Sequence, residues 1–320
     1  MFSELPKLFD RDFAVGFFLP LAVFIPCMYF VASAFPSTNI ANFIKGIEVL
    51  QAKPGPFEAA ILVVVSWLGG ILLLVLNSTL IRFKEGYGRY NPLQLLKWRE
   101  VARFHRLHAV LDALEGHRKN LKKLHLELDA DSRAQWMKLA EEKAIRFPHA
   151  EEFVLPTAFG NVMRAWEMYP LVMYGLDAIP GWDRLIYLIP EDVRPLISQD
   201  KAFMDFWLNV WILSIAVSVE YFILMALTHG QGSPWSLLSI PVAALASNRA
   251  RQAAADWGKS VKAAFDVYLP ELREKLGIAS DPERKEERRQ WVLMSRAMLY
   301  RNPGALPPRA APNPDTSKGE

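Results

Sequence analysis

One carboxylate, Glu220, lies within an otherwise uncharged stretch of the chain, 206–227. If this stretch crosses a membrane as a helix, the rise of about 1.5 Å per residue puts Glu220 roughly 10 Å from the nearer end. A carboxylate at that depth is neutral, paired with another polar group or in contact with water. Three interpretations stay open: an ion or proton path, a protonated side chain that joins two helices by hydrogen bonds, or a side chain that reaches outward to the headgroups.

Other polar side chains match Glu220 in depth or share its helix face. Asn209 comes eleven positions before Glu220, close to three helical turns, so both side chains lie on one face. Counting along the neighbouring apolar stretches places four more polar residues at the depth of Glu220 or of Asn209. We call this set the polar seam: Tyr29, Ser66, Asn77, Asn209, Glu220 and Ser239. It is expected either to line a water-filled path or to mark the interior of a helix bundle.

The best metal-binding pattern in the chain consists of two histidines and two acids, His105, His108, Asp112 and Glu115. At about 100° per residue they share an arc of about 80° on one helix, which suits zinc or another divalent ion. The same spacing also describes the solvated face of an amphipathic helix, because apolar residues such as Phe104 occupy the neighbouring arc. We favour the solvated face and expect no cofactor.

Signatures of the common enzyme classes are absent from the sequence. It contains no Walker-type phosphate loop, no Gly-x-Gly-x-x-Gly, no His-Glu-x-x-His and no nucleophile elbow. A single cysteine, Cys27, provides neither an internal disulfide nor a thiolate metal cluster. We therefore expect a protein that is not an enzyme.

Four stretches are apolar and long enough to be membrane-spanning helices: 13–35, 59–81, 206–227 and 234–256. About 20 helical residues cross a hydrocarbon core of about 30 Å. The fourth stretch contains Asn248, Arg249 and Arg251, although long basic side chains can extend to the headgroups.

The first stretch has an alternative interpretation as a cleaved signal peptide, because Ala32-Ser33-Ala34 resembles a cleavage site. Its apolar run is longer than the roughly 7 to 15 residues typical of a signal peptide, and Glu4 and Asp10 precede it. We therefore expect a retained membrane-spanning helix.

Basic residues are distributed unevenly between the loops. Lys and Arg are concentrated in 82–202 and after Arg249, whereas the two loops on the opposite side contain only Lys45 and Lys53. The positive-inside rule makes the basic segments and both termini cytoplasmic. The net charge of +3 reflects this orientation, so no nucleic-acid partner is expected.

The predicted organisation has six segments. A cytoplasmic N-terminus (1–12) precedes a transmembrane hairpin (13–81), a helical cytoplasmic domain (82–202) and a second hairpin (203–256). Cytoplasmic helices (257–301) then pack on the domain and lead to a disordered tail (302–320).

Apolar periodicity and helix-capping residues predict the helices of the cytoplasmic domain. They cover 93–125, 131–146 with Asp131 as N-cap, and a segment that begins near Thr157. The segment 171–190 either lies at the membrane interface or packs under the domain. The helix leaving the fourth span is expected to end near Tyr268 and to pack Val261, Ala264, Phe265 and Tyr268 on the domain.

Three motifs resemble a family of uncharacterised bacterial integral membrane proteins. They are Arg82-Phe-Lys-Glu-Gly-Tyr87, Leu155-Pro-Thr-Ala-Phe-Gly-Asn161 and Ala264-Phe-Asp-Val-Tyr268. The resemblance covers most of 82–276, with departures at Lys84 and at Trp257-Gly258. It implies a multi-pass protein of the bacterial inner membrane, and it implies no activity.

The sequence thus predicts an all-α, polytopic membrane protein with four transmembrane helices and a helical cytoplasmic domain. The leading hypothesis is a non-enzymatic scaffold or docking component that contacts the lipid bilayer and a cytoplasmic protein partner. Association with a second copy stays open as an alternative to helix packing within the chain. The alternative is an oligomeric ion channel or pore that uses the seam at Asn209 and Glu220.

Overall fold

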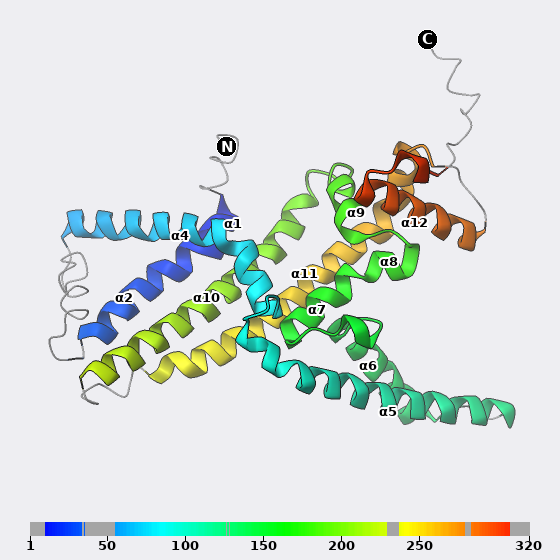
Figure 1. Ribbon diagram of the computed structural model, residues 1–320, viewed down its shortest axis with the longest axis horizontal. Helices are drawn as coiled ribbons and strands as arrows, with labels where there is room; N and C mark the ends of the chain where they lie inside the picture. Colours follow the sequence, from blue (N-terminus) through cyan, green and yellow to red (C-terminus); the bar gives the residue numbers. More distant parts are fainter. Residues whose placement is uncertain are drawn as a thin grey trace, which may run out of the picture. The chain divides into compact units, whose positions relative to one another are not determined.

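The computed structural model describes residues 10–33, 35, 55–125, 127, 129–228, 237–278 and 283–307. Each element of secondary structure in that part of the chain is a helix or a helical turn (Figure 1), which confirms the all-α class. The chain divides into two compact units. Unit 1 comprises Met1–Gly88 and Ser198–Ala254, and unit 2 comprises Arg89–Ile197 and Ala255–Glu320.

Three helices among the described residues are long and apolar enough to cross a membrane: Arg11–Ser33, Ala59–Glu85 and Arg194–Leu227. Three of the four expected spans therefore correspond to observed helices, as a membrane-embedded chain requires. The first helix consists of α1 (Arg11–Phe13), a π-helical turn η2 (Ala14–Phe18) and α2 (Leu19–Ser33), and the others belong to α4 (Pro56–Glu85) and α10 (Arg194–Leu227).

The fourth expected span, 234–256, is not among these three helices. Its beginning lies outside the described residues, and the part from Ser239 forms the start of the long helix α11 (Ser239–Lys275). Polar and basic residues at Asn248, Arg249 and Arg251 shorten the apolar run of α11, so hydropathy does not identify it as a span.

Helix α11 continues beyond the end expected near Tyr268. It includes Pro270 and ends at Lys275. A proline in a helix interior removes one backbone hydrogen bond, so the turn around it needs support from packing. Leu269 and Leu272 supply that support, because both are buried in the core of unit 2.

Apolar contacts join the helices of unit 1. One cluster joins the end of α2 to α10 through Val31, Ala32, Phe35, Val217, Tyr221 and Leu224. A second cluster centres on Leu208, Val210 and Trp211 of α10 and on Ala246 of α11. Helix α4 instead exposes Val64, Leu68, Leu72 and Val75, and these side chains are available to lipid.

Unit 2 is a helical domain that also contains the second part of α11. Its remaining helices are α5 (Lys97–Lys123), α6 (Ala130–Arg146), α7 (Ala158–Glu167), α8 (Tyr169–Tyr174), α9 (Ala178–Leu185) and α12 (Arg284–Tyr300). Short 3-10 turns cover Pro92–Leu96, Glu151–Phe153 and Pro303–Ala305. The predicted disordered tail therefore begins with an ordered turn, and its residues 308–320 lie outside the described chain.

Two helix starts in unit 2 test the capping predictions. Thr157 is the N-cap of α7, as expected, and its Oγ1 accepts a hydrogen bond from the Gly160 amide at 2.9 Å. For α6 the prediction of Asp131 was wrong, because Asp129 accepts the bond from the Ser132 amide at 3.0 Å. Either acid fits the capping pattern, and only the conformation of the preceding loop distinguishes them.

The core of unit 2 confirms the packing expected for α11. Val261, Ala264 and Phe265 are buried, and Tyr268 packs against the same cluster. Their neighbours from 171–190 are Leu176, Leu185 and Ile189, which are all fully buried. Of the two interpretations left open for 171–190, the structure therefore supports packing within the domain.

Candidate functional site

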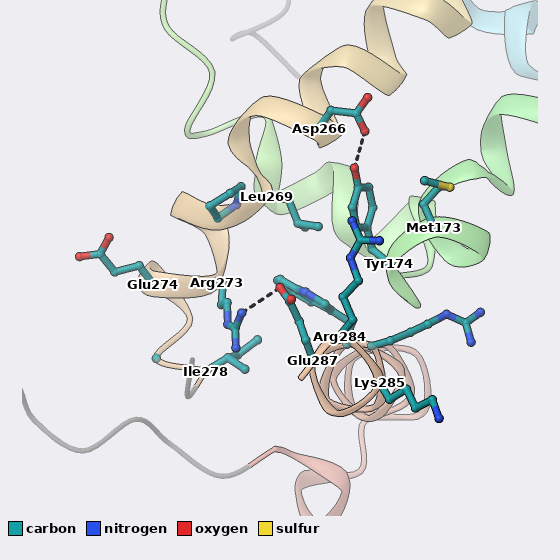
Figure 2. Close-up of a pocket in the computed structure, with 14 residues that line it drawn as sticks. Met173, Tyr174, Asp266, Leu269, Arg273, Glu274, Ile278, Arg284, Lys285 and Glu287 are labelled. Atoms are coloured by element: carbon teal, nitrogen blue, oxygen red, sulfur yellow. Dashed lines mark hydrogen bonds and ion pairs between the residues drawn. The ribbon is translucent and has the colours of Figure 1, made fainter. Parts of the chain in front are cut away.

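A cavity of unit 2 lies between α8, the end of α11 and the first turns of α12 (Figure 2). Its volume is about 720 Å³, large enough for several side chains of a bound partner. The residues that line it are Met173, Tyr174, Asp266, Leu269, Pro270, Arg273, Glu274, Gly277, Ile278, Arg284, Lys285, Glu287, Arg288 and Trp291.

The floor of this cavity is apolar and rigid. Leu269, Ile278 and Trp291 are buried members of the unit 2 core and also line the cavity. Packed core side chains keep their positions, so the floor is a preformed apolar surface. It suits an apolar side chain of a ligand.

Charged groups surround the floor. Arg273 Nη1 donates to Glu287 Oε1 at 2.8 Å, and this ion pair joins α11 to α12. Arg288 donates to the backbone oxygen of Leu171 at 3.3 Å. Figure 2 shows Arg284 and Lys285 on α12, and Glu274 directed away from them.

The first turns of α12 have an excess of available positive charge. The acids Glu286 and Glu287 form ion pairs with Arg289 and Arg273, respectively. Arg284 and Lys285 are exposed and form no ion pair with another described residue. The positive end of the helix dipole adds to their field, so this wall of the cavity attracts anions.

A carboxylate with two phenol partners closes one side of the cavity. Asp266 accepts hydrogen bonds from Tyr174 at 2.6 Å and from Tyr169 at 2.9 Å. Burial, followed by these bonds to the carboxylate, raises the pKa of both phenols. Both tyrosines therefore remain neutral donors at physiological pH, and Asp266 is occupied by them.

The three motifs that carry the family resemblance have structural roles. Gly86 ends α4 in the left-handed conformation, at φ 95°, which strongly favours glycine. Asn161 is buried and bonds both the amide and the carbonyl of Leu155, which fixes the start of α7. Asp266 holds the two tyrosines beside the cavity. These interactions explain the motifs without any reaction chemistry.

The proposed metal ligands pair with other groups. His105 lies 3.1 Å from Glu151, Asp112 lies 3.4 Å from His108, and Lys119 lies 3.1 Å from Glu115. The ion pair with Lys119 also lowers the pKa of Glu115. No three histidine, cysteine or acidic side chains in the described chain are arranged to hold a metal ion. The four side chains form the solvated face of α5.

Three members of the polar seam form hydrogen bonds between helices of unit 1. Asn77 donates to Asp205 at 3.0 Å, Asn209 donates to the backbone oxygen of Gly16 at 2.8 Å, and Ser239 lies 2.7 Å from Ser218. These bonds join α4, η2 and α11 to α10. Half of the six predicted seam residues thus join helices.

The remaining seam members are not joined to one another by hydrogen bonds. Ser66 Oγ is fully buried without a hydrogen-bond partner, and both carboxyl oxygens of Glu220 lack a partner among the described residues. Tyr29 is half-buried on α2. Residues at the same depth in a helix bundle do not necessarily contact one another.

Several buried charged residues were missed from the sequence, among them Asp205 and Lys84. Asp205 accepts bonds from Asn77 and, at 2.6 Å, from Lys201. Lys84 donates to Ser247 at 2.9 Å. A signal existed for Asp205, because Lys201, Asp205 and Asn209 follow one another at intervals of four on one helix face. Lys84 instead looked like an ordinary basic residue at a span end.

Comparison with known proteins gives no match to a family model, a curated protein or a solved structure. Function must be inferred from this chain alone. Two features stand out: the charged cavity of unit 2 and the buried polar groups of unit 1.

Proposed function

We propose that this chain is a non-enzymatic docking component of the bacterial inner membrane, in the family that its motifs resemble. Unit 1 anchors it with four spans, and unit 2 binds a cytoplasmic protein partner. The observation that carries this proposal is the cavity of unit 2, in which an apolar floor lies beside the cationic first turns of α12.

The chemistry of the cavity selects the kind of partner. An apolar side chain fits against Leu269, Ile278 and Trp291, while carboxylates fit beside Arg284 and Lys285. Amphipathic helices with one apolar and one acidic face present these groups together. The proposed occupant is therefore an acidic amphipathic helix of a partner protein.

The buried side chains of unit 1 support this proposal over an ion channel. A channel needs polar groups along a continuous wet path. Asn209 is fully buried and bonded to η2, while Asn77 and Asp205 bond each other, so these groups are closed off within the chain. A docking protein needs no water-filled path, so its buried polar groups can remain bonded within the chain.

Packing supports a fourth span at the start of α11. Residues 239–254 belong to unit 1, where Ser239 lies 2.7 Å from Ser218 and Ala246 is fully buried against α10. Small residues at these positions let two helices approach closely, as in membrane helix pairs. Arg249 and Arg251 then extend to the cytoplasmic headgroups.

Reporter fusions test this topology. Fusions after Pro54, Ser132, Gly232 and Pro303 should report outside, inside, outside and inside, respectively. An inside signal after Gly232 would remove the fourth span and the four-span topology with it. An outside signal after Pro303 would contradict the common cytoplasmic location of 82–202 and the C-terminal part.

Peptide binding tests the docking proposal. The full-length protein in nanodiscs is titrated with a fluorescent helical peptide that has leucines on one face and glutamates on the other. The charge-reversed peptide, with lysine at each glutamate position, serves as the ligand control. We expect the acidic peptide to bind and the basic peptide not to bind, with an affinity that falls as salt is added.

Charge-reversal variants locate the binding site. Arg284→Glu combined with Lys285→Glu should weaken binding of the acidic peptide about tenfold or more, equivalent to about 1.4 kcal/mol. The matched control is Arg296→Glu with Arg301→Glu, because both residues are exposed at the far end of α12 and do not line the cavity. Equal losses in both double variants, or equal binding of the two peptides, would contradict the proposal.

A further inference from the structure

Glu220 lies buried in unit 1 without any described partner. Its exposed fraction is 8%, and neither carboxyl oxygen has a hydrogen-bond partner in the described chain. The flanking residues Val217, Tyr221 and Leu224 pack against the end of α2. The carboxyl group thus lies at an apolar contact between α2 and α10, inside a helix apolar enough to cross a membrane.

The charged form of this group has no stabilising partner among the described residues. Burial removes the water that would solvate a carboxylate, and no cation among the described residues acts on Glu220. The other titratable side chains on α2 and on this part of α10 are Cys27, Tyr29 and Tyr221, and none of these is a basic side chain. An isolated carboxylate in a low-dielectric interior takes up a proton instead of remaining charged.

A second buried carboxyl group on the same helix provides the contrast. Asp205 is only 2% exposed, so it is more deeply buried than Glu220. Unlike Glu220, it accepts hydrogen bonds from Lys201 at 2.6 Å and from Asn77 at 3.0 Å. An adjacent ammonium group and an amide donor favour the ionised form. Burial alone therefore does not decide the state of a carboxyl group on α10, because its partners differ.

We propose that Glu220 is a proton-binding site of the membrane unit and is occupied at neutral pH. Because a carboxylate needs water or a cation, Glu220 releases its proton only when water reaches the contact between α2 and α10. The bound proton therefore stabilises the closed contact between these helices. This site is independent of partner binding by unit 2.

Infrared spectroscopy tests the protonation state directly. A protonated carboxyl group has a carbonyl stretching band distinct from that of a carboxylate, and it shifts in deuterated water. The wild-type protein in liposomes is compared with Glu220→Gln at neutral pH, since glutamine keeps the shape and the hydrogen-bonding groups but cannot ionise. We expect the variant to lose one such band. Identical spectra in this region for both proteins would overturn the proposal.

Chemical modification identifies the residue. Dicyclohexylcarbodiimide is lipid-soluble and adds to protonated carboxyl groups to give a stable N-acylurea, which mass spectrometry locates. We expect the adduct at Glu220 to exceed the adduct at Asp205 at least tenfold and to decrease as the pH is raised. Modification of Asp205 at an equal rate would contradict the assignment of the bound proton to Glu220, the carboxyl group without a described partner.

Discussion

The ammonium group of Lys84 lies 3.5 Å from the centroid of the Trp211 ring. Lys84 is only 3% exposed and ends the apolar part of α4, while Trp211 belongs to the cluster that joins α10 to α11. A cation held against an aromatic face is stabilised electrostatically, and more strongly when water is excluded. This contact, with the hydrogen bond to Ser247, links three helices of unit 1.

Replacing Trp211 should be more harmful than replacing Lys84. Trp211→Leu leaves the buried ammonium group without its ring and is expected to destabilise the protein by about 2 to 4 kcal/mol. Lys84→Met removes the charge together with its need for partners, so its effect should be smaller. Thermal unfolding in detergent, followed by circular dichroism, compares the two variants. A larger loss for Lys84→Met would show that the ammonium group itself stabilises the bundle.

The hydrogen bond from Asn209 to Gly16 should contribute measurably to the stability of unit 1. Asn209→Leu keeps a similar volume but removes the bond, and we expect a loss of about 1 kcal/mol. Tyr29→Phe is the control within the polar seam, because the Tyr29 hydroxyl bonds no described residue. Equal unfolding midpoints for Asn209→Leu and the wild-type protein would mean that the bond adds no net stability.

Two glycines in helices of unit 2 should respond in opposite directions to alanine. A Cβ at Gly258 would lie 2.5 Å from Cδ1 of Trp166, so Gly258→Ala forces the two helices apart and should cost about 1 to 3 kcal/mol. A Cβ at Gly116, in α5, meets no atom within 4 Å. Gly116→Ala should therefore stabilise the protein by about 0.5 to 1 kcal/mol. Chemical denaturation of both variants tests the pair, and stabilisation by Gly258→Ala would refute the close contact.

The tyrosines bonded to Asp266 should make the protein less stable at high pH. The pKa of Tyr169 and of Tyr174 is raised above the ordinary value of 10.0, first by burial and then by the bond to Asp266. A raised pKa in the folded state gives stability that is complete below about pH 10 and is lost as the pH rises above it. Spectrophotometric titration should show two late-titrating phenols, and Asp266→Asn should bring both back toward 10.0. Unchanged titration in Asp266→Asn would exclude the carboxylate as a cause.

Local signals in the sequence predicted local structure well. Hydropathy located three helices that can cross a membrane, and Thr157 marked the start of α7 because an N-cap depends on only a few residues. The expected end of α11 near Tyr268 was wrong, because the buried Leu269 and Leu272 hold the helix through Pro270. In α11, tertiary packing outweighs the helix-breaking tendency of Pro270.

Contacts between distant segments could not be predicted in the same way. Spacing along α10 placed Asn209 and Glu220 on one helix face, but it left open whether that face lines a water-filled path or contacts another helix. In the structure Asn209 donates to the Gly16 carbonyl, a partner that the spacing could not identify. The cavity of unit 2 likewise requires Tyr174, Arg273 and Lys285, which come from three separate helices. Its position depends on how these helices pack, and no single helix determines that.

The π-helical turn Ala14–Phe18 sets the rotation of the first apolar helix. A π turn contains one more residue than the corresponding α-helical turn, so everything after it is rotated by about 100° relative to a regular helix. Deleting one residue from this turn would restore regular geometry and swing Val31 and Ala32 away from α10. The extra residue of the π turn therefore determines which face of the following helix meets α10. A substitution in the turn keeps this orientation, whereas a single deletion would rotate the entire helix that follows.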